Sequence, residues 1–517
     1  MRHLLSVSRS HAAPRAAAAL AAVLLAGSLL TSACARPKPA PPTPTPPPGD
    51  AGPSSPPAPP TWIDASASPF AVRGVIEGFY GTPWTQEKRL EAFGFMARVG
   101  MNTYVYAPKD DPYQRAQWRE LYPETELARF RALLERAAKD RVNFVYSISP
   151  GLDIIYSGLA DRQALDDKLD QLASLGIHTI MLSLDDVPEK LKPADTVIFK
   201  DDYALAQAEL ANWLYTTRRA KDSAFVLWLT PSHYYGTKAD PYLTTLGSRL
   251  HADIPIVWTG PMVVSGHITN EQADAFAGII KRKPLIWDNY PVNDYTYAID
   301  KKPRLILGPL RNRDAGLADH VSGYLLNPMI QESASQMPLY TAAAYLASPT
   351  SYNPDAAWKE AAVRFSGISV AAAVLEEFAS YAQRSAVQPK EAPLLAAALQ
   401  AYGKTGTGGS GGANLRARFD SMVSLPTRLA AAAPPGFYGE VKPWVDALHD
   451  KGQAGLLALE VEDARVRGDT ATVQSQLPRL QQALTALKEQ QAKAMIAGNL
   501  VEDFVAQVID RAQVAVK

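Results

Sequence analysis

The sequence predicts an α/β domain built as a (β/α)8 barrel, followed by an all-α helical bundle. Eight short apolar runs alternate with amphipathic segments between residues 72 and 328, which is the order of a parallel barrel. No Gly-rich phosphate loop follows the first run, and a doubly wound sheet is usually shorter, so the barrel is favoured. Beyond residue 353 the strand-like runs stop, and Ala, Leu, Glu, Gln and Arg dominate.

The barrel elements follow from hydrophobic periodicity. Apolar side chains at helical spacing predict helices over residues 85–99, 124–140 and 201–220, and a further helix that carries Leu165, Leu169 and Leu172 and ends at Gly176. The predicted strands are residues 72–80, 102–108, 142–150, 179–186, 224–231, 255–260, 284–290 and 321–328.

The C-terminal part is predicted to be helical, and no catalytic role is assigned to it. A flexible loop is predicted over residues 403–412, and the Ala and Leu stripes around it are interpreted as core. The predicted helices are residues 374–383, 394–402, 415–432, 441–468 and 472–497. The domains that we predict are residues 68–352 for the catalytic barrel and 353–517 for the helical bundle.

The N-terminus has the composition of a targeting segment. Basic residues precede an apolar stretch, 16–30, that is too short and too rich in alanine to favour a permanent transmembrane helix. The next residues, Leu30-Thr-Ser-Ala-Cys34, resemble a bacterial lipoprotein processing site, so Cys34 is a candidate for lipidation, with simple cleavage as the alternative. Residues 1–34 are therefore predicted to be a signal peptide, and the Pro-rich residues 35–67 a disordered linker. We expect an exported protein that is lipid-anchored to the bacterial cell envelope, or otherwise secreted.

Composition argues against several classes of partner and cofactor. Lys plus Arg and Asp plus Glu both total 52, so no nucleic-acid partner is predicted. With Cys34 as the single cysteine, neither a disulfide framework nor a thiolate metal cluster is expected. The eight histidines do not fall into an HExxH spacing, so no metal and no cofactor are predicted. The oligomeric state is left open.

The fourth predicted strand ends in two adjacent carboxylates, Asp185 and Asp186, and Pro188 stops its continuation. Two neighbouring acids repel each other, and burial disfavours their charged forms, so a fold rarely keeps such a pair for stability. Acid–base catalysis requires one ionised and one protonated carboxyl group. The alternative is that one Asp caps the next helix while the other is solvated.

Polar and aromatic residues follow the other strands at the same end of the predicted barrel, where barrel enzymes carry their active sites. Aromatic walls with amide and carboxylate side chains are typical of a sugar pocket. Singly, each has a simpler explanation: Gly78 could relieve crowding, Lys109 could pair with Asp110 or Asp111, and tryptophans are usually core. His233 is interpreted as a polar neighbour of the mouth. The candidates are Gly78, Lys109, Tyr234, Trp258, Trp287, Asn289, Asp294 and Asn327.

Long motifs in the barrel region resemble glycoside hydrolase family 84, the β-N-acetylglucosaminidases that include the protein O-GlcNAcases. The resemblance covers roughly residues 70–350, in the family's order, and extends more weakly into the helical part. The motifs are RGVIEGFYGTPW at 73–84, NTYVYAPKDD at 102–111, SISPGLD at 147–153, Asp185-Asp186, IWDN at 286–289 and NDY at 293–295.

The resemblance implies a retaining exo-β-N-acetylglucosaminidase that works by substrate-assisted catalysis on a terminal N-acetylglucosamine of a glycan or glycoprotein. The acetamido oxygen of the substrate attacks the anomeric carbon and gives an oxazoline, so neither carboxylate acts as nucleophile, unlike the usual pair. Asp185 is implied to polarise the acetamido N–H, and Asp186 to be the general acid and then the base.

The resemblance also implies the substrate-binding residues. Tyr234 is expected against the oxazoline, and Trp287 is expected in the acetyl pocket. Lys109, Asp294 and the loop after the first strand are expected to close the pocket behind one sugar. Contacts to the sugar hydroxyls or the acetamido group are implied for Gly78, Lys109, Asn289, Asp294 and Asn327.

Two other functions stay open on the sequence alone. One is an endo-acting, hyaluronidase-like hydrolase, which would need a cleft rather than a closed pocket. The other is a non-catalytic sugar-binding lipoprotein, against which the presence of both Asp185 and Asp186 counts.

Overall fold

The structure is a computed structural model that describes residues 61–516, so the predicted signal peptide, Cys34 and most of the predicted linker lie outside the described residues. All eight predicted strands are present, each shorter than predicted because only the paired core of each run counts as strand. They are β1 Arg73–Glu77, β2 Thr103–Tyr106, β3 Asn143–Ile148, β4 Thr179–Ser183, β5 Val226–Thr230, β6 Val257–Trp258, β7 Leu285–Asp288 and β8 Gly323–Leu326.

The strands form one parallel sheet that closes on itself. Its order is β5-β4-β3-β2-β1-β8-β7-β6, in which β1 pairs with both β2 and β8. A single parallel bridge between Leu229 and Ile256 joins the two outer strands, and the Leu229 N–H donates to Pro255 O at 2.9 Å. The (β/α)8 prediction is therefore confirmed.

Alternation along the strands separates two cores. A small cluster of inward-facing side chains fills the barrel, as side-chain layers do in this architecture. The outward-facing residues instead join a much larger core beneath the helices. The inner cluster consists of Ile76, Val105, Ala107, Val145, Met181, Trp228, Val257, Leu285, Trp287 and Leu325.

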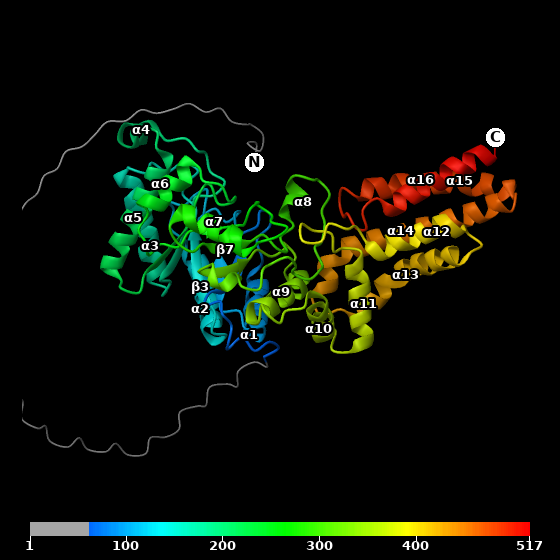
Figure 1. The fold of residues 1–517 in the computed structure, drawn as a ribbon, viewed down its shortest axis with the longest axis horizontal. Helices are drawn as coiled ribbons and strands as arrows, with labels where there is room; N and C mark the ends of the chain where they lie inside the picture. The colour runs from blue at the N-terminus through cyan, green and yellow to red at the C-terminus, as the bar shows by residue number, and fades with distance from the viewer. Residues whose placement is uncertain (1–60, 517) are drawn as a thin grey trace, which may run out of the picture. The chain divides into compact units, whose positions relative to one another are not determined.

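The helices that belong to the barrel cover the strands, and Figure 1 shows them in blue to green. The predicted helices over 85–99, 124–140 and 201–220 are confirmed as α1, α2 and α5. The helices are α1 Gln86–Arg98, α2 Glu124–Lys139, α3 Leu159–Ala173, α4 Pro193–Phe199, α5 Tyr203–Lys221, α6 Pro241–Arg249, α7 Asn270–Ile280, α8 Asp294–Ala298 and α9 Glu332–Ala347, with a 3-10 turn at Leu317–Asp319.

The remaining chain is helical, as predicted, although two expected bounds were wrong. The predicted loop over residues 403–412 is mostly helix, and only residues 406–409 separate α12 from α13. The predicted helix over 472–497 ends at Gln490, and a further helix follows it. The helices are α10 Pro354–Ser366, α11 Ser369–Ser380, α12 Pro393–Thr405, α13 Ser410–Ala432, α14 Phe437–Val466, α15 Thr470–Gln490 and α16 Leu500–Ala515.

Specific polar contacts attach helix α14 and two of the loops in the helical part to the segment between β7 and β8. Pro303 O accepts the Trp444 indole N–H at 2.9 Å and the Met495 N–H at 2.7 Å. Next to it Arg304 forms a salt bridge of 2.9 Å with Glu391. None of the helices within residues 61–516 is long and apolar enough to cross a membrane.

Candidate active site

The two aspartates lie just beyond β4, at the carboxyl end of the barrel. Asp185 is buried, with only 4% of its surface exposed, whereas Asp186 is exposed. The backbone of Asp186 is left-handed, with a φ of 53°, a conformation that is uncommon for a residue other than glycine and that is found in functional turns. Neither carboxylate caps a helix, because α4 begins only at Pro193. The turn thus gives the neighbouring acids opposite environments.

Asp185 is held by a buried ion pair. Its Oδ2 accepts a hydrogen bond from the Lys109 ammonium group, and both side chains are almost fully enclosed. The alternative partners of Lys109, Asp110 and Asp111, instead accept from Gly81 N–H at 3.1 Å and from the Tyr106 hydroxyl at 2.7 Å. The second oxygen of Asp185, Oδ1, is buried without a hydrogen-bond partner. A buried acceptor in this state favours a ligand that brings an N–H or O–H donor.

Asp186 is oriented by two phenols. The Tyr80 hydroxyl donates to its Oδ2 at 2.9 Å, and the Tyr234 hydroxyl donates to its Oδ1 at 3.0 Å. Burial, and then the neighbouring Asp186 charge, raise the pKa of both tyrosines far above the ordinary value. Both phenols therefore keep the protons that they donate.

A buried arginine, Arg115, supports the Asp186 turn and Tyr80 through hydrogen bonds. Arg115 donates from one nitrogen to the Tyr80 hydroxyl oxygen at 2.9 Å and from another to the backbone carbonyl of Asp186 at 2.9 Å. The first bond directs the Tyr80 proton toward Asp186, and the second holds the left-handed turn in place. Arg115 thus positions both the Asp186 carboxylate and its donor.

The side wall of the site is a network around Trp287. The indole N–H donates to Asn289 Oδ1 at 3.0 Å, and Asn327 Nδ2 donates to the same oxygen at 2.9 Å. Asn327 Oδ1 in turn accepts the Gly78 N–H at 3.2 Å. The Lys109 ammonium lies 5.5 Å from the centroid of the Trp287 ring, within cation–π distance. The strand ends β1, β2, β7 and β8 thus meet at one aromatic side chain.

Gly78 is required by this packing. A Cβ atom at this position would lie 2.3 Å from Cζ2 of Trp287, closer than real contacts allow. The simpler explanation for Gly78, relief of crowding at a strand end, therefore holds, because the missing side chain leaves room for the Trp287 ring.

Asp294 closes the far side of the site. It begins α8, is mostly buried, and accepts the Tyr80 backbone N–H at 2.8 Å. Burial raises the pKa of its carboxyl group, against the opposing effect of hydrogen bonds from backbone N–H groups. This bond ties the loop after β1 to the loop after β7.

The structure thus gathers all seven predicted substrate-binding residues around the aspartate pair, whereas Trp258, the other candidate, and the neighbouring His233 make their contacts elsewhere. Trp258 is core, stacked on Phe276 at 5.3 Å between ring centroids. His233 Nδ1 lies 2.8 Å from Asp240, whose hydrogen bond raises the pKa of the imidazole, and Nε2 lies 3.3 Å from Glu189. Sequence reasoning gave no role to Tyr80, which stands in the RGVIEGFYGTPW motif, or to Arg115, which lies in an irregular loop without any local signal.

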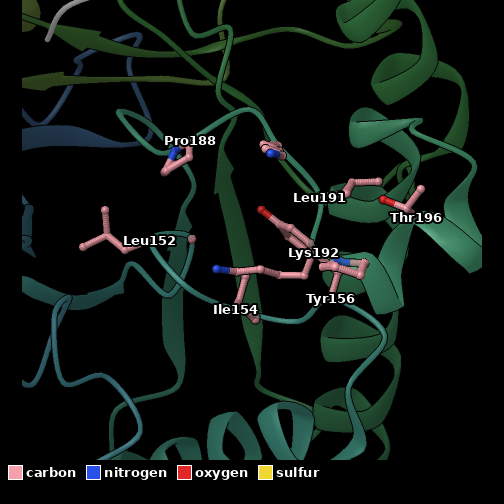
Figure 2. Close-up of a pocket in the computed structure, with 10 residues that line it drawn as sticks. Leu152, Ile154, Tyr156, Pro188, Leu191, Lys192 and Thr196 are labelled. Atoms are coloured by element: carbon pink, nitrogen blue, oxygen red, sulfur yellow. The ribbon is translucent and has the colours of Figure 1, made fainter.

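A pocket of about 620 Å³ lies beside the site, between the loops that follow β3 and β4 (Figure 2). None of the predicted site residues lines it, although Pro188 belongs to the loop that carries both acids. Within residues 61–516, no cluster of three or more His, Cys, Asp or Glu side chains could hold a metal ion.

Comparison with known families agrees with this geometry. A family model described as beta-N-acetylglucosaminidase matches residues 73–380, which is more than half of the chain. The chain belongs to this family, glycoside hydrolase family 84. A second model, described as Hyaluronidase post-catalytic domain-like, matches residues 393–505 in the helical part of this family member.

Individual relatives of this family 84 chain give the same assignment. Protein O-GlcNAcase of Mus musculus is 37% identical over 307 residues, which are 58% of this chain and 32% of that protein. The protein of the same name from Rattus norvegicus is 37% identical over 313 residues, 57% of this chain and 33% of that protein. The chain therefore matches about a third of the length of these curated relatives.

Solved structures extend the likeness into the helical part. A mutant of the Thermobaculum terrenum O-GlcNAc hydrolase superposes with a TM-score of 0.77 at 32% identity, over 85% of this chain and 95% of that one. A second structure, named CpGH84B, gives a TM-score of 0.74 at 29% identity, over 85% and 77% of the two chains. The combination of barrel and helical domain is thus shared with these enzymes.

Gly78→Ala tests the packing against Trp287. We expect the variant to lose about 1–3 kcal/mol of unfolding free energy, because the new methyl group forces the indole ring out of its place. Gly278→Ala is the matched control, since nothing lies within 4 Å of the new Cβ in helix α7 and alanine favours helix. Urea unfolding measures both variants. Equal stability of Gly78→Ala and the unchanged protein would contradict the role given to this glycine.

Proposed function

We propose that this protein is a retaining exo-β-N-acetylglucosaminidase that removes terminal N-acetylglucosamine by substrate-assisted catalysis through an oxazoline. Family membership supports the reaction class. The observation that carries the mechanism is the asymmetry of the pair: Asp185 is buried with one unpartnered oxygen, while its neighbour Asp186 is exposed.

Asp185 is suited to hold the acetamido group. Its Oδ1 offers an acceptor for the substrate N–H, and Lys109 occupies the other oxygen and keeps the charge in place. As the acetamido oxygen bonds to the anomeric carbon, positive charge develops on the nitrogen. A fixed carboxylate in an enclosed site stabilises that charge without having to reorganise.

Asp186 is suited to move the proton. It is exposed, so a leaving group can reach it, and Tyr80 and Tyr234 fix both of its oxygens. In the first step it gives a proton to the leaving oxygen. In the second it accepts a proton from the water that opens the oxazoline, so one residue serves both half-reactions.

The exo mode is supported by the loops that close the site. The Tyr80 N–H bond to Asp294 and the Gly81 N–H bond to Asp110 fasten the loop after β1 across the mouth of the barrel. Lys109 lies buried beneath it. Such a closed end accepts a terminal sugar, whereas an internal residue of a polymer would need a cleft open on both sides.

The substrate that we propose is a glycan or glycoprotein that bears N-acetylglucosamine, met outside the cytoplasm by a protein lipid-anchored at Cys34. The support for the anchor is the sequence Leu30-Thr-Ser-Ala-Cys34 behind an apolar stretch. We expect the full-length protein to sediment with membranes, and Cys34→Ser to be released into the soluble fraction. Membrane association that is unchanged in Cys34→Ser would remove the lipid anchor from the proposal.

The reaction is tested with aryl N-acetylglucosaminides beside the matching aryl glucosides. We expect cleavage of the N-acetyl substrates alone, because the glucosides lack the acetamido nucleophile. Asp186→Asn should lose about 10²- to 10⁴-fold with a phenyl leaving group and far less with 2,4-dinitrophenyl, which needs little acid assistance. Asp185→Asn should lose heavily with both.

Two outcomes would change the assignment. If the protein cleaves glucosides as readily, the acetamido group does not participate and the mechanism is wrong. If it cleaves neither substrate but binds N-acetylglucosamine, the protein is a non-catalytic sugar-binding protein and not an enzyme.

Tyr80→Phe tests how Asp186 is positioned. We expect kcat/KM to fall roughly tenfold with phenyl N-acetylglucosaminide and to change little with the dinitrophenyl substrate. The reason is that kcat/KM reports the step in which the leaving group departs, and only the phenyl group needs acid assistance from Asp186 in that step. Tyr215→Phe is the matched control, since it removes a phenol that donates to a carboxylate, Asp253, elsewhere. A loss that is equal for both leaving groups would mean that Tyr80 only supports the loop.

A further inference from the structure

The pocket beside the acids has one apolar wall and one basic wall. Leu152, Ile154 and Tyr156 come from the loop after β3, and Lys190 and Lys192 come from the loop after β4. Figure 2 shows the space between Pro188 and Leu152 on one side and Leu191 and Thr196 on the other. Its volume, about 620 Å³, falls within the range of small-molecule sites.

The pocket is built in advance by a fully buried carboxylate. Asp195 of α4 accepts the backbone N–H groups of Tyr156 at 2.9 Å and Ser157 at 2.8 Å, and the Ser157 hydroxyl at 2.6 Å. These bonds join the two loops that form the walls. A preformed pocket binds without the entropic cost of ordering its own loops.

No carboxylate within residues 61–516 forms an ion pair with the basic wall. The adjacent Glu189 lies 3.3 Å from His233 Nε2, so its negative charge faces another loop. Lys190 and Lys192 form no ion pair with any residue in the part of the chain that the structure describes, and both are exposed. Two ammonium groups over an apolar floor suit a ligand with a negative charge and an apolar face.

The pocket also lies close in the chain to Asp186, the proposed acid for the leaving group. Pro188 lines it and is two residues from Asp186, which bounds the separation of their Cα atoms at about 7 Å. On the proposed function, Asp186 protonates the leaving oxygen, so the rest of the leaving group extends to the Asp186 side of the site. A chain of one or two further units therefore reaches the pocket.

We propose that this pocket binds the leaving group and selects leaving groups that carry a carboxylate. This inference rests on the proposed function and adds to it the class of group to which N-acetylglucosamine is attached. The carboxylate belongs either to an acidic sugar or to an acidic residue of a polypeptide. Lys190 and Lys192 supply the attraction, and Leu152 and Ile154 supply the surface against which the group lies.

The experiment compares matched substrates in the full-length protein. One pair is N-acetylglucosamine linked to a hexuronic acid or to the neutral hexose. The other pair is a peptide glycosylated on serine with flanking Asp and Glu or with flanking Asn and Gln. We expect kcat/KM to favour the acidic member of at least one pair about 3- to 10-fold, since each exposed charge pair contributes a factor of up to about five. The pair that shows the preference identifies the source of the carboxylate.

Lys190→Gln/Lys192→Gln should abolish that preference and leave hydrolysis of the aryl N-acetylglucosaminides unchanged. Lys139→Gln/Lys283→Gln is the matched control, because it removes the same charge at positions that precede strands β3 and β7, at the opposite end of the barrel. The preference should persist in this control and weaken as salt is added.

Three results would overturn the inference. They are no preference in the unchanged protein, a preference that survives Lys190→Gln/Lys192→Gln, and an equal loss in the control variant. In each of these cases, continued hydrolysis of the aryl N-acetylglucosaminides would still support the proposed function. If the unchanged protein does not hydrolyse them, the proposed function itself is wrong.

Discussion

The buried ion pair between Lys109 and Asp185 is the interaction on which the site depends. It compensates a negative charge in an enclosed position, where a carboxylate without any partner would be costly. With Asp185 fixed, its exposed neighbour Asp186 follows through the left-handed turn that Arg115 holds. The indole of Trp287 lies beside the ammonium group, and Gly78 makes room for the ring. One pair thus sets the arrangement of four loops.

The parallel barrel also determines where the site residues lie. The site side chains lie at or beyond the carboxyl ends of the strands, so the parallel sheet brings residues that are more than two hundred positions apart into one mouth. Glu77, the last residue of β1, is fully buried and accepts the Trp84 backbone N–H at 3.0 Å and two hydrogen bonds from Arg89. This anchor fastens the loop that carries Gly78 and Tyr80 from below. Rigid strands and anchored loops together hold the site to the tolerance that catalysis requires.

The fold could be predicted from the sequence because hydrophobic periodicity and composition indicate which segments are strands and which are helices. All eight strand runs end in polar or glycine-rich segments, and the change at residue 353 marks the helical part. Sequence reasoning singled out Asp185 and Asp186 as candidates because two acids directly after an apolar run are unusual. It did not give Lys109 its partner, because Asp110 and Asp111 are nearer in sequence than Asp185. It did not identify Arg115, because a single arginine in an irregular loop belongs to no periodic pattern. Only the folded loop shows where its guanidinium group points.

The unpartnered oxygen of Asp185 has a consequence for the stability of the protein. A buried acceptor that stays without a donor costs on the order of 1–3 kcal/mol, and on the proposed mechanism the acetamido N–H of the substrate is that donor. If the site acts as proposed, Asp185 is kept for activity at a cost in stability. Apolar side chains of similar volume in place of Lys109 and Asp185 would give a more stable protein without the activity. In this protein the site is the part of the fold at which stability and activity are in conflict.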